Sequence, residues 1–386
     1  MERLIKTRTC IDCDQFLSKM ALSKYCYYVW FLLLALFALV ANSKELIVLS
    51  APSILDAQYH DIFYDLINFQ IRLAKSILGK DDVVVLADKS TVPYLTGRSH
   101  KVRERLSRSL LLEAKLYDLR LRPFAPFFMK DEAVKFECSL RGQDPLANRE
   151  SDQAMKHFLQ QSGIKVENVE NRLALCGGDV VHNDHDIAFI DELALLNNGR
   201  TFPAGTVTWR LLKLFKQVVP VAMPQEPTAN QFKQIDDMVS FIDRNVIVLG
   251  QMLDESTTFM RKKLNDTFGD KLGIIDVFLN QTESSCGMYN ALLTTERFIY
   301  MPVFGSDVDS WKMGYSTLQD HKMLQLVQMN SHKRVVPVKM PRSICISGLN
   351  LKSMSWKVKG AMADRLKRLA KLQATKRLLK RLRLLS

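Results

Sequence analysis

Apolar positions follow two different spacings along the chain, and both spacings recur from its first third to its last. Glu45–Ser50 and Asp82–Ala87 are short, nearly continuous apolar runs that predict buried strands, whereas Ala57–Leu78 has apolar residues at helical spacing. The later runs predict one more helix, Thr208–Val218, and the strands Asn171–Leu175, Ile187–Ile190, Asn245–Leu249, Phe298–Val303 and Val335–Val338. Strands and helices that alternate with short connections are typical of an α/β fold.

A longer apolar run precedes this pattern. Tyr25–Ala41 has 17 residues without a charge and follows several basic residues, Arg3, Lys6, Arg8, Lys19 and Lys24. This arrangement predicts an N-terminal hydrophobic signal or anchor helix with the rest of the chain across the membrane. The small residues around Ala41-Asn42-Ser43 favour cleavage, and the long leader favours an anchor, so both alternatives stay open beside a buried core helix. We expect a secretory-pathway protein, either secreted or a single-pass type II membrane protein with a lumenal or extracellular domain.

The other end of the chain is strongly basic. Ala361–Ser386 has nine Lys or Arg against the single acid Asp364, and so supplies +8 of the formal net charge of +13. Leucines recur among these basic residues, which predicts an amphipathic cationic helix. Residues 1–43, 44–360 and 361–386 are therefore predicted as leader, single domain and tail. Anionic lipid or a sulfated glycan suits such a tail across a membrane, where nucleic acid is not expected, and a solvated tail is the alternative.

Glycosylation signals and cysteines agree with a lumenal location without proving it. Asn265-Asp-Thr and Asn280-Gln-Thr are acceptor sequons for N-glycosylation. Four of the seven cysteines follow the leader, namely Cys138, Cys176, Cys286 and Cys345. Four cysteines in so long a domain are too few for a fold that depends on disulfides.

Five stretches, in this order, resemble the agmatine deiminase and bacterial-type peptidylarginine deiminase family of the guanidine-modifying superfamily. They are Leu73–Leu86, Arg122-Pro-Phe-Ala-Pro126, Gly177-Gly-Asp-Val-Val181, Tyr300-Met-Pro-Val-Phe-Gly305 and Met354-Ser-Trp-Lys-Val-Lys-Gly360. The resemblance covers nearly all of residues 44–360. It implies a fivefold pseudo-symmetric α/β propeller, the pentein fold. We expect no cofactor and no metal.

The resemblance also implies where the catalytic groups stand. In the family a thiolate attacks the guanidinium carbon, a histidine moves protons and carboxylates grip the guanidinium nitrogens. The nucleophile position falls on Ser353, and Lys352 beside it is expected to point the other way on a strand. The histidine region corresponds to Val248–Arg261, which has no histidine and only Asp254 and Glu255 as acids.

Two other family motifs differ from each other in how well they survive. The motif Trp-x-Arg-Asp corresponds to Arg120-Leu-Arg-Pro123, so an arginine replaces the tryptophan and a proline replaces the acid that contacts the guanidinium. We expect the new cation to repel a cationic ligand at a cost of at least ~1 kcal/mol. Gly177-Gly178-Asp179 survives, and a purely structural turn is the alternative to a retained ligand site.

One cluster of candidate ligands lies outside these motifs. His182, Asp184, His185 and Asp186 are close in sequence, but their spacing on a strand puts His185 on the opposite face from the others. A polar turn before Ile187 explains this cluster better than a metal site.

Three hypotheses follow for the function. The first is a catalytically inactive deiminase-like protein that binds or scaffolds an unknown protein or a guanidine-type ligand. The second is an active hydrolase that deiminates agmatine or arginine-type guanidines through a rearranged site with Ser353, Asp179 and Asp254 or Glu255. The third gives the function to the basic tail as a tether to a membrane or polyanion.

Overall fold

The first described part of the chain is a strand, a helix and a parallel strand, as the apolar pattern predicts. β1 (Leu46–Ser50) pairs in parallel with β2 (Asp82–Ala87), and α2 (Phe63–Ile77) connects them after a 3₁₀ turn, η1 (Ala57–Tyr59). Every residue of β1 is buried, which explains its unbroken apolar run. Gly79 has φ of +84°, a conformation that only glycine adopts without strain, and the chain leaves α2 there.

The computed structural model describes residues 45–97, 99–129, 132–140, 143–168, 173–200, 203, 205–222, 234–251, 255–278, 285–305 and 316–383. Among them, Glu45 onward forms one compact unit. No helix in these ranges is apolar enough over a sufficient length to span a bilayer. The predicted signal or anchor run, residues 25–41, lies outside the described residues and stays a prediction.

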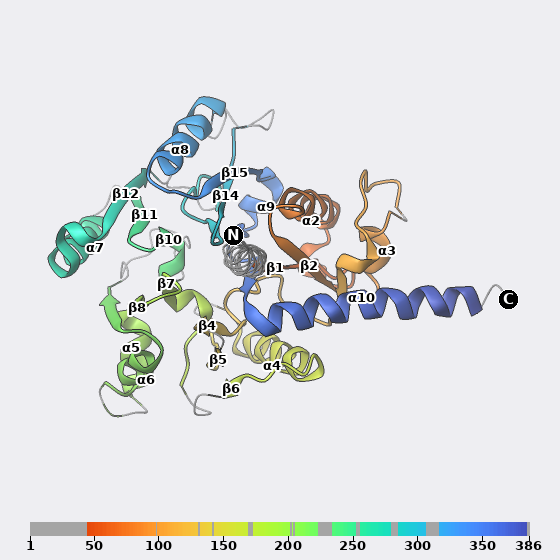
Figure 1. The fold of residues 1–386 in the computed structure, drawn as a ribbon, viewed down its shortest axis with the longest axis horizontal. Coiled ribbons are helices and arrows are strands. Elements are labelled where there is room, and N and C mark those ends of the chain that lie inside the picture. The colour runs from red at the N-terminus through yellow and green to blue at the C-terminus, as the bar shows by residue number, and fades with distance from the viewer. Residues whose placement is uncertain are drawn as a thin grey trace, which may run out of the picture. The chain divides into compact units, whose positions relative to one another are not determined.

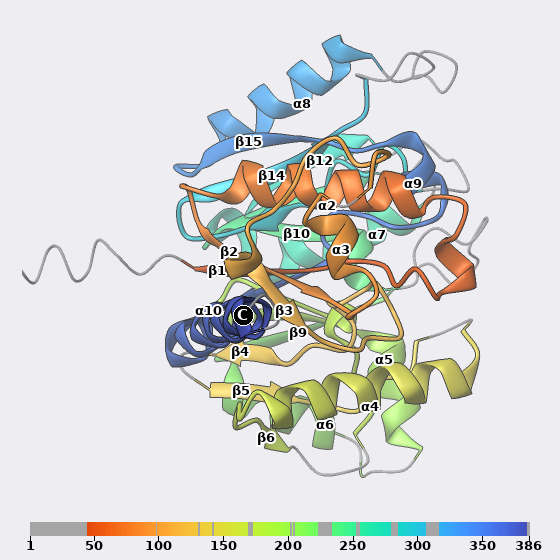
Figure 2. The ribbon, with the colours of Figure 1, turned by 90° about the vertical axis from the view of Figure 1, so that its right-hand side faces the viewer.

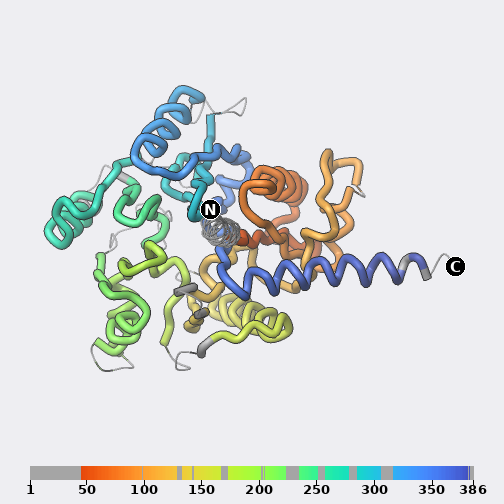
Figure 3. Tube along the Cα trace, in the orientation of Figure 1, coloured from red at the N-terminus to blue at the C-terminus, as the bar shows by residue number. Residues whose placement is uncertain are grey.

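The strands of the described residues form five sheets with one pairing pattern. In each sheet a central strand, β1, β5, β8, β11 or β14, pairs antiparallel with one neighbour and parallel with the other. The sheet orders are β16-β1-β2-β3, β4-β5-β6, β7-β8-β9, β10-β11-β12 and β13-β14-β15. The sheets follow one another around a common centre, and β16 beside β1 joins the two ends of the unit (Figure 1). The colour sequence of the chain trace passes once around the molecule (Figure 3).

The remaining elements have these bounds. The strands are β3 (Leu111–Glu113), β4 (Phe127–Met129), β5 (Glu132–Lys135), β6 (Glu167–Asn168), β7 (Val180–His182), β8 (Ile187–Asp191), β9 (Gln217–Val221), β10 (Val239–Asp243), β11 (Val246–Gln251), β12 (Gly273–Phe278), β13 (Leu293–Thr294), β14 (Phe298–Val303), β15 (Arg334–Lys339) and β16 (Ser355–Val358). The helices are α3 (Val92–Leu95), α4 (Pro145–Gln161), α5 (Glu192–Gly199), α6 (Thr206–Leu214), α7 (Glu255–Phe268), α8 (Thr317–Met329), α9 (Arg342–Ile346) and α10 (Gly360–Arg383), with 3₁₀ turns η2 (Arg108–Leu110), η3 (Gly177–Asp179), η4 (Ile235–Asp237) and η5 (Gly269–Lys271).

Two sequence predictions are wrong in detail. The predicted helix Thr208–Val218 ends at Leu214, and the chain then enters β9, where Val219 and Val221 are buried beside β8. Tertiary pairing of this β-branched segment outweighs its helical apolar spacing. The predicted strand Asn171–Leu175 is reduced, within the described residues, to an isolated bridge between Ala174 and Glu137.

The basic tail is helical, as predicted, but its first half belongs to the core. Ala363, Leu366 and Ala370 of α10 are buried in one cluster with Trp356 and Val358 of β16. The predicted boundary at residue 360 thus coincides with the start of α10, and the helix packs before it leaves the domain. Figure 2 looks along α10 from its C-terminal end, and the middle of the helix lies beside β3.

Candidate functional site

Loops from several sheets converge on one pocket near the centre of the unit. Its volume is about 180 Å³. Its lining combines charged, amide and hydroxyl groups, namely Gln58, Tyr59, Arg120, Arg122, Pro123, Leu140, Gln143, Gln234, Asp236, Asp237, Ser285, Ser347, Gly348, Leu349, Asn350 and Ser353. We call it the central pocket. Its residues come from distant parts of the sequence, so the fold alone brings them together.

Ser353 does line this pocket, as its position in the family motif implies. Its hydroxyl donates to the carbonyl of Asn350 at 3.0 Å, and its backbone nitrogen donates to Asn350 Oδ1 at 2.7 Å. Ser353 lies in a turn before β16 rather than on a strand. The hydroxyl is therefore held by its own turn, and no base contacts it among the described residues.

Lys352 points away from Ser353, as expected, although the turn and not strand alternation separates them. Its ammonium donates to Asp236 O, Val239 O and Ser240 Oγ at 2.9, 3.2 and 2.9 Å. It lines a second, smaller pocket of about 70 Å³, which shares Arg122 with the central pocket. Burial, together with the nearby charge of Arg122, lowers the pKa of Lys352 to about 8 against the opposing effect of Asp236 and Asp237.

Arg120 is a paired cation, which corrects the expectation that it repels a cationic ligand. Its Nε and Nη2 atoms donate to the two carboxylate oxygens of Asp118 at 3.0 and 2.6 Å. Both side chains are largely buried. This two-point pair neutralises the charge in place, so Arg120 acts by occupying a carboxylate rather than by repulsion.

The second arginine of the motif, Arg122, lies against an acid that sequence reasoning missed. Its Nε is 3.5 Å from Asp236 Oδ2, without hydrogen-bond geometry, and its Nη2 donates to Val180 O at 3.2 Å. Asp236 and Asp237 belong to η4, which no family motif marked. Their only sequence signal is a pair of acids before the apolar run of β10.

The Gly-Gly-Asp motif holds the pocket wall and does not face the pocket. Asp179 Oδ2 accepts from the backbone nitrogen of Cys176 at 2.9 Å, and its Oδ1 accepts from Gln234 Nε2 at 3.2 Å. A Cβ on Gly177 would lie 1.8 Å from the carbonyl oxygen of Arg122, and one on Gly178 would lie 2.2 Å from Gln234 Oε1. The motif is therefore explained by close packing, the alternative that the sequence left open.

Gly177→Ala is expected to lower the free energy of unfolding by about 2 kcal/mol, because a methyl group there must displace backbone and not a flexible side chain. Gly199→Ala is the matched control, since Gly199 ends α5 with no atom within 4 Å of an added Cβ. Urea denaturation of both variants tests this. Equal losses in the two variants would contradict the packing role of Gly177.

The acidic and histidine cluster forms the turn between β7 and β8. Asp184, with φ of +64°, lies 3.1 Å from His182 Nδ1 and forms ion pairs with Lys357 and Lys359. Lys357 is the foremost cause that lowers the pKa of Asp184 well below its usual value, against the effect of burial. The polar turn accounts for Asp184 and His182 through its ion pairs with Lys357 of β16 and with Lys359.

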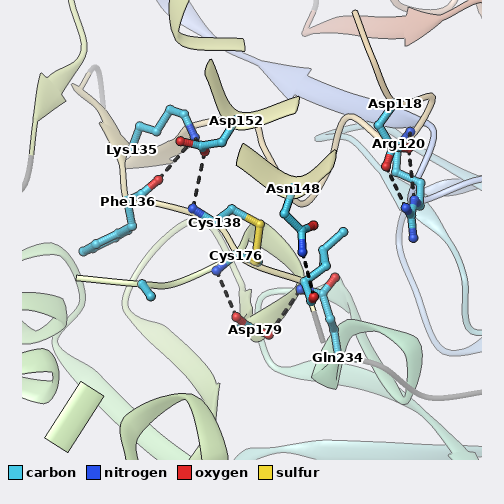
Figure 4. Close-up of a disulfide and its surroundings, with 12 residues drawn as sticks. Asp118, Arg120, Lys135, Phe136, Cys138, Asn148, Asp152, Cys176, Asp179 and Gln234 are labelled. Carbon is cyan, nitrogen blue, oxygen red and sulfur yellow. Dashed lines mark hydrogen bonds and ion pairs between the residues drawn. A yellow bond between two sulfur atoms is a disulfide. The ribbon is translucent and has the colours of Figure 1, made fainter. Parts of the chain in front are cut away.

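Two disulfides fix the rim of the central pocket. Cys138 bonds to Cys176, and Cys286 bonds to Cys345. Cys138 lies two residues before the lining residue Leu140, and Cys176 directly precedes Gly177. Cys286 follows the lining residue Ser285. Figure 4 shows the first disulfide beside Asp152 and Asp179, which accept the backbone N–H groups of Cys138 and Cys176. Cys345, eight residues before Ser353, is thus a disulfide cysteine.

The other predicted site residues fall partly outside the described chain. Asp254 and Asn280 lie outside it, and Glu255 begins α7 with a side chain that is not described. Asn265 is exposed on α7. Neither Asp254 nor Glu255 is among the described residues that line the central pocket.

Comparisons with known proteins agree with this geometry. A family model for the Porphyromonas-type peptidyl-arginine deiminase matches residues 41–349, while no curated protein sequence matches the chain. An agmatine deiminase from C. jejuni is 13% identical, with a TM-score of 0.64 over 82% of this chain and 94% of that one. The agmatine deiminase of Enterococcus faecalis is 13% identical, with a TM-score of 0.61 over 82% and 93%.

A third similar structure is the putative arginine deiminase from Porphyromonas gingivalis, 14% identical with a TM-score of 0.61 over 82% of this chain and 96% of that one. At these identities the structures establish a shared α/β fold of the pentein type, as the resemblance implied. The family model covers most of the sequence. The chain is therefore a member of the Porphyromonas-type peptidyl-arginine deiminase family.

Proposed function

We propose that this protein is a catalytically inactive deiminase relative that serves as a binding or scaffolding module. The observation that carries the proposal is that charged and hydroxyl groups of the pocket already pair with other groups of the chain. Arg120 takes both oxygens of Asp118, Arg122 lies against Asp236, and the hydroxyl of Ser353 is held by Asn350. A guanidinium ligand would have to displace one of these internal partners.

The residues needed for the family reaction support the same reading. A serine hydroxyl is far less acidic than a thiol and requires a positioned base to attack a guanidinium carbon. The sequence has no histidine between His185 and His321, and His182 lies in the second pocket beside Asp184. The described lining of the central pocket therefore has no thiol to attack the guanidinium carbon and no histidine to protonate the leaving amine.

A binding role is supported by the disulfides beside the pocket walls. Both disulfides lie beside residues that line it, and fixed walls reduce the conformational entropy that a ligand must overcome. The lining offers N–H donors, amides and carboxylates over a small volume. We expect the occupant to be a small polar ligand or a polar side chain of a partner protein.

The secretory location and the finer fold belong to this proposal. Disulfides persist in oxidising compartments, which agrees with the apolar run at residues 25–41 and the exposed sequon at Asn265. The predicted single-pass or secreted form places the domain on the lumenal or extracellular side. The five sheets with one pairing pattern support a fivefold pseudo-symmetric propeller.

The deciding experiment measures ammonia and ureido product from agmatine, arginine and an arginyl peptide with the full-length protein. We expect no product above a blank without protein, and the same silence from Ser353→Cys, because restoring the thiol restores no base. Activity in the parent protein that disappears in Ser353→Ala would overturn the proposal and establish the alternative hydrolase. An active agmatine deiminase in the same assay is the positive control.

A further inference from the structure

The helix α10 has an apolar face that the core does not use. Its first half buries Ala363, Leu366 and Ala370. In its second half the exposed leucines are Leu372, Leu378, Leu379 and Leu382, with exposed fractions of 50%, 58%, 52% and 55%. A soluble domain seldom leaves so many large apolar side chains in water on one short segment, so this face is a candidate contact surface.

The exposed leucines lie together on the helix surface. Leu372 and Leu379 are seven positions apart, Leu382 lies three positions after Leu379, and Leu378 lies four positions before Leu382. These spacings place them along one side of an α-helix. Lys376 and Lys380 are exposed beside this stripe. The second half of α10 is therefore amphipathic, with its apolar side turned away from the face that the first half buries.

Contacts with the sheets hold α10 as far as Arg377. Lys367 pairs with Asp82 at 2.7 Å, Gln373 accepts from the backbone nitrogen of Glu113, and Arg377 forms an ion pair with Glu113. Beyond Arg377, the described residues form no hydrogen bond or ion pair with the sheets that holds the helix. Figure 1 shows α10 extending from the centre past β2 to the edge of the molecule. Its last turns are thus available for an external surface.

The start of α10 lies close to the point where the predicted membrane segment ends in the sequence. Leu46 is paired with Val358, and Lys359 Nζ lies 2.7 Å from Glu45 Oε1. Only residues 42–44 separate Glu45 from the apolar run that ends at Ala41. The four steps from Ala41 to Glu45 span at most about 14 Å when extended. The predicted membrane segment is therefore joined to the start of α10 through a short stretch of chain and the β1–β16 pair.

We propose that the second half of α10, Leu372–Arg383, lies in the surface of an anionic bilayer. The leucines enter the boundary between headgroups and acyl chains, and Lys376 and Lys380 contact lipid phosphates. A sulfated glycan would use the lysines but leave the leucines in water, so the exposed apolar face favours lipid. This inference goes beyond the proposed pocket function and does not depend on what the pocket binds.

The test uses the full-length protein in vesicles of phosphatidylcholine with phosphatidylglycerol as about 30% of the lipid. Leu379→Trp adds one fluorophore to the four native tryptophans, and brominated lipid then quenches only groups within the bilayer. We expect quenching of about half of the added fluorescence. Phe259→Trp is the matched control, at a residue of α7 with 59% exposure, and its added fluorescence should stay unquenched.

Two further measurements make the outcome specific. Adding Leu378→Ser and Leu382→Ser to Leu379→Trp should reduce the quenching at least ~3-fold, because the apolar face is then interrupted. Neutral phosphatidylcholine should also reduce it. Equal quenching at positions 379 and 259 would overturn the proposal, and so would heparin binding that requires Lys376 and Lys380 while position 379 stays unquenched.

Discussion

Replacing Cys138 and Cys176 together with alanine is expected to lower the free energy of unfolding by about 4 kcal/mol, because their disulfide closes a loop of 38 residues. A cross-link between two positions so far apart in sequence removes much conformational entropy from the unfolded chain. Urea denaturation of the parent and the double variant, both without reductant, gives the difference. This change is a large fraction of the net stability of a typical domain.

The local contacts of this disulfide allow a sharp control. Asp152 Oδ1 accepts from the backbone nitrogen of Cys138 at 3.3 Å and from Lys135 Nζ at 2.5 Å, and neither bond requires the sulfurs. The double variant should therefore match the parent with that disulfide selectively reduced. A loss below about 1 kcal/mol would show that the loop is already closed by these polar contacts and that the disulfide adds little.

The elements that sequence reasoning predicted well are those whose burial leaves a periodic trace. β2 has the predicted bounds, and α2 follows the predicted apolar spacing. In both elements the buried side chains recur at the period of the backbone, so burial can be recognised from the sequence. The family motifs then implied the pentein fold. The same resemblance led to Ser353, whose spacing from Trp356 in the last motif puts it in the turn before β16, at the central pocket.

The rest of the site depends on contacts that no local pattern encodes. Asp236 and Asp237 reach the central pocket from η4, more than a hundred residues from both Arg122 and Ser353. The pairing of Arg120 with Asp118 reversed the expected effect of that arginine. Asp118 is only two residues away, but a side chain's direction in an irregular loop follows from packing and not from period.

The same limit applied to the glycine motif. Gly177 and Gly178 were recognised as a motif, but their role required the distances to Arg122 and Gln234. Chemistry-bearing residues in a family motif are therefore weak evidence of chemistry when the turn also serves packing. This packing agrees with the proposed function, in which the pocket walls serve binding and not catalysis.

Lys352 is the group through which this altered centre should affect stability most directly. Its three acceptors hold the ammonium beside the second pocket, and burial lowers its pKa to about 8. An unfolded chain restores the ordinary lysine pKa near 10.4. Between these two values the unfolded state binds more protons than the folded state, so the contribution of Lys352 to stability rises with pH.

The difference in unfolding free energy between the parent and Lys352→Met is expected to move in favour of the parent by about 2 kcal/mol from about pH 7.5 to 10.5. The full shift would give about 3 kcal/mol, but the side chain lines the second pocket and water there reduces the effect. Methionine keeps the stem of the side chain without the charge. Urea denaturation at intervals of pH for both proteins gives the difference directly.

Comparison with the variant is necessary because other lysines titrate in the opposite sense. Asp184 and Glu45 raise the pKa of Lys359, so its contribution is present below the ordinary lysine pKa and is lost only as the pH rises through the raised value. That loss occurs equally in the parent and in Lys352→Met and cancels in the difference. A difference that stays flat across this range would mean that Lys352 keeps its proton in the folded protein and that its three oxygen acceptors outweigh its burial.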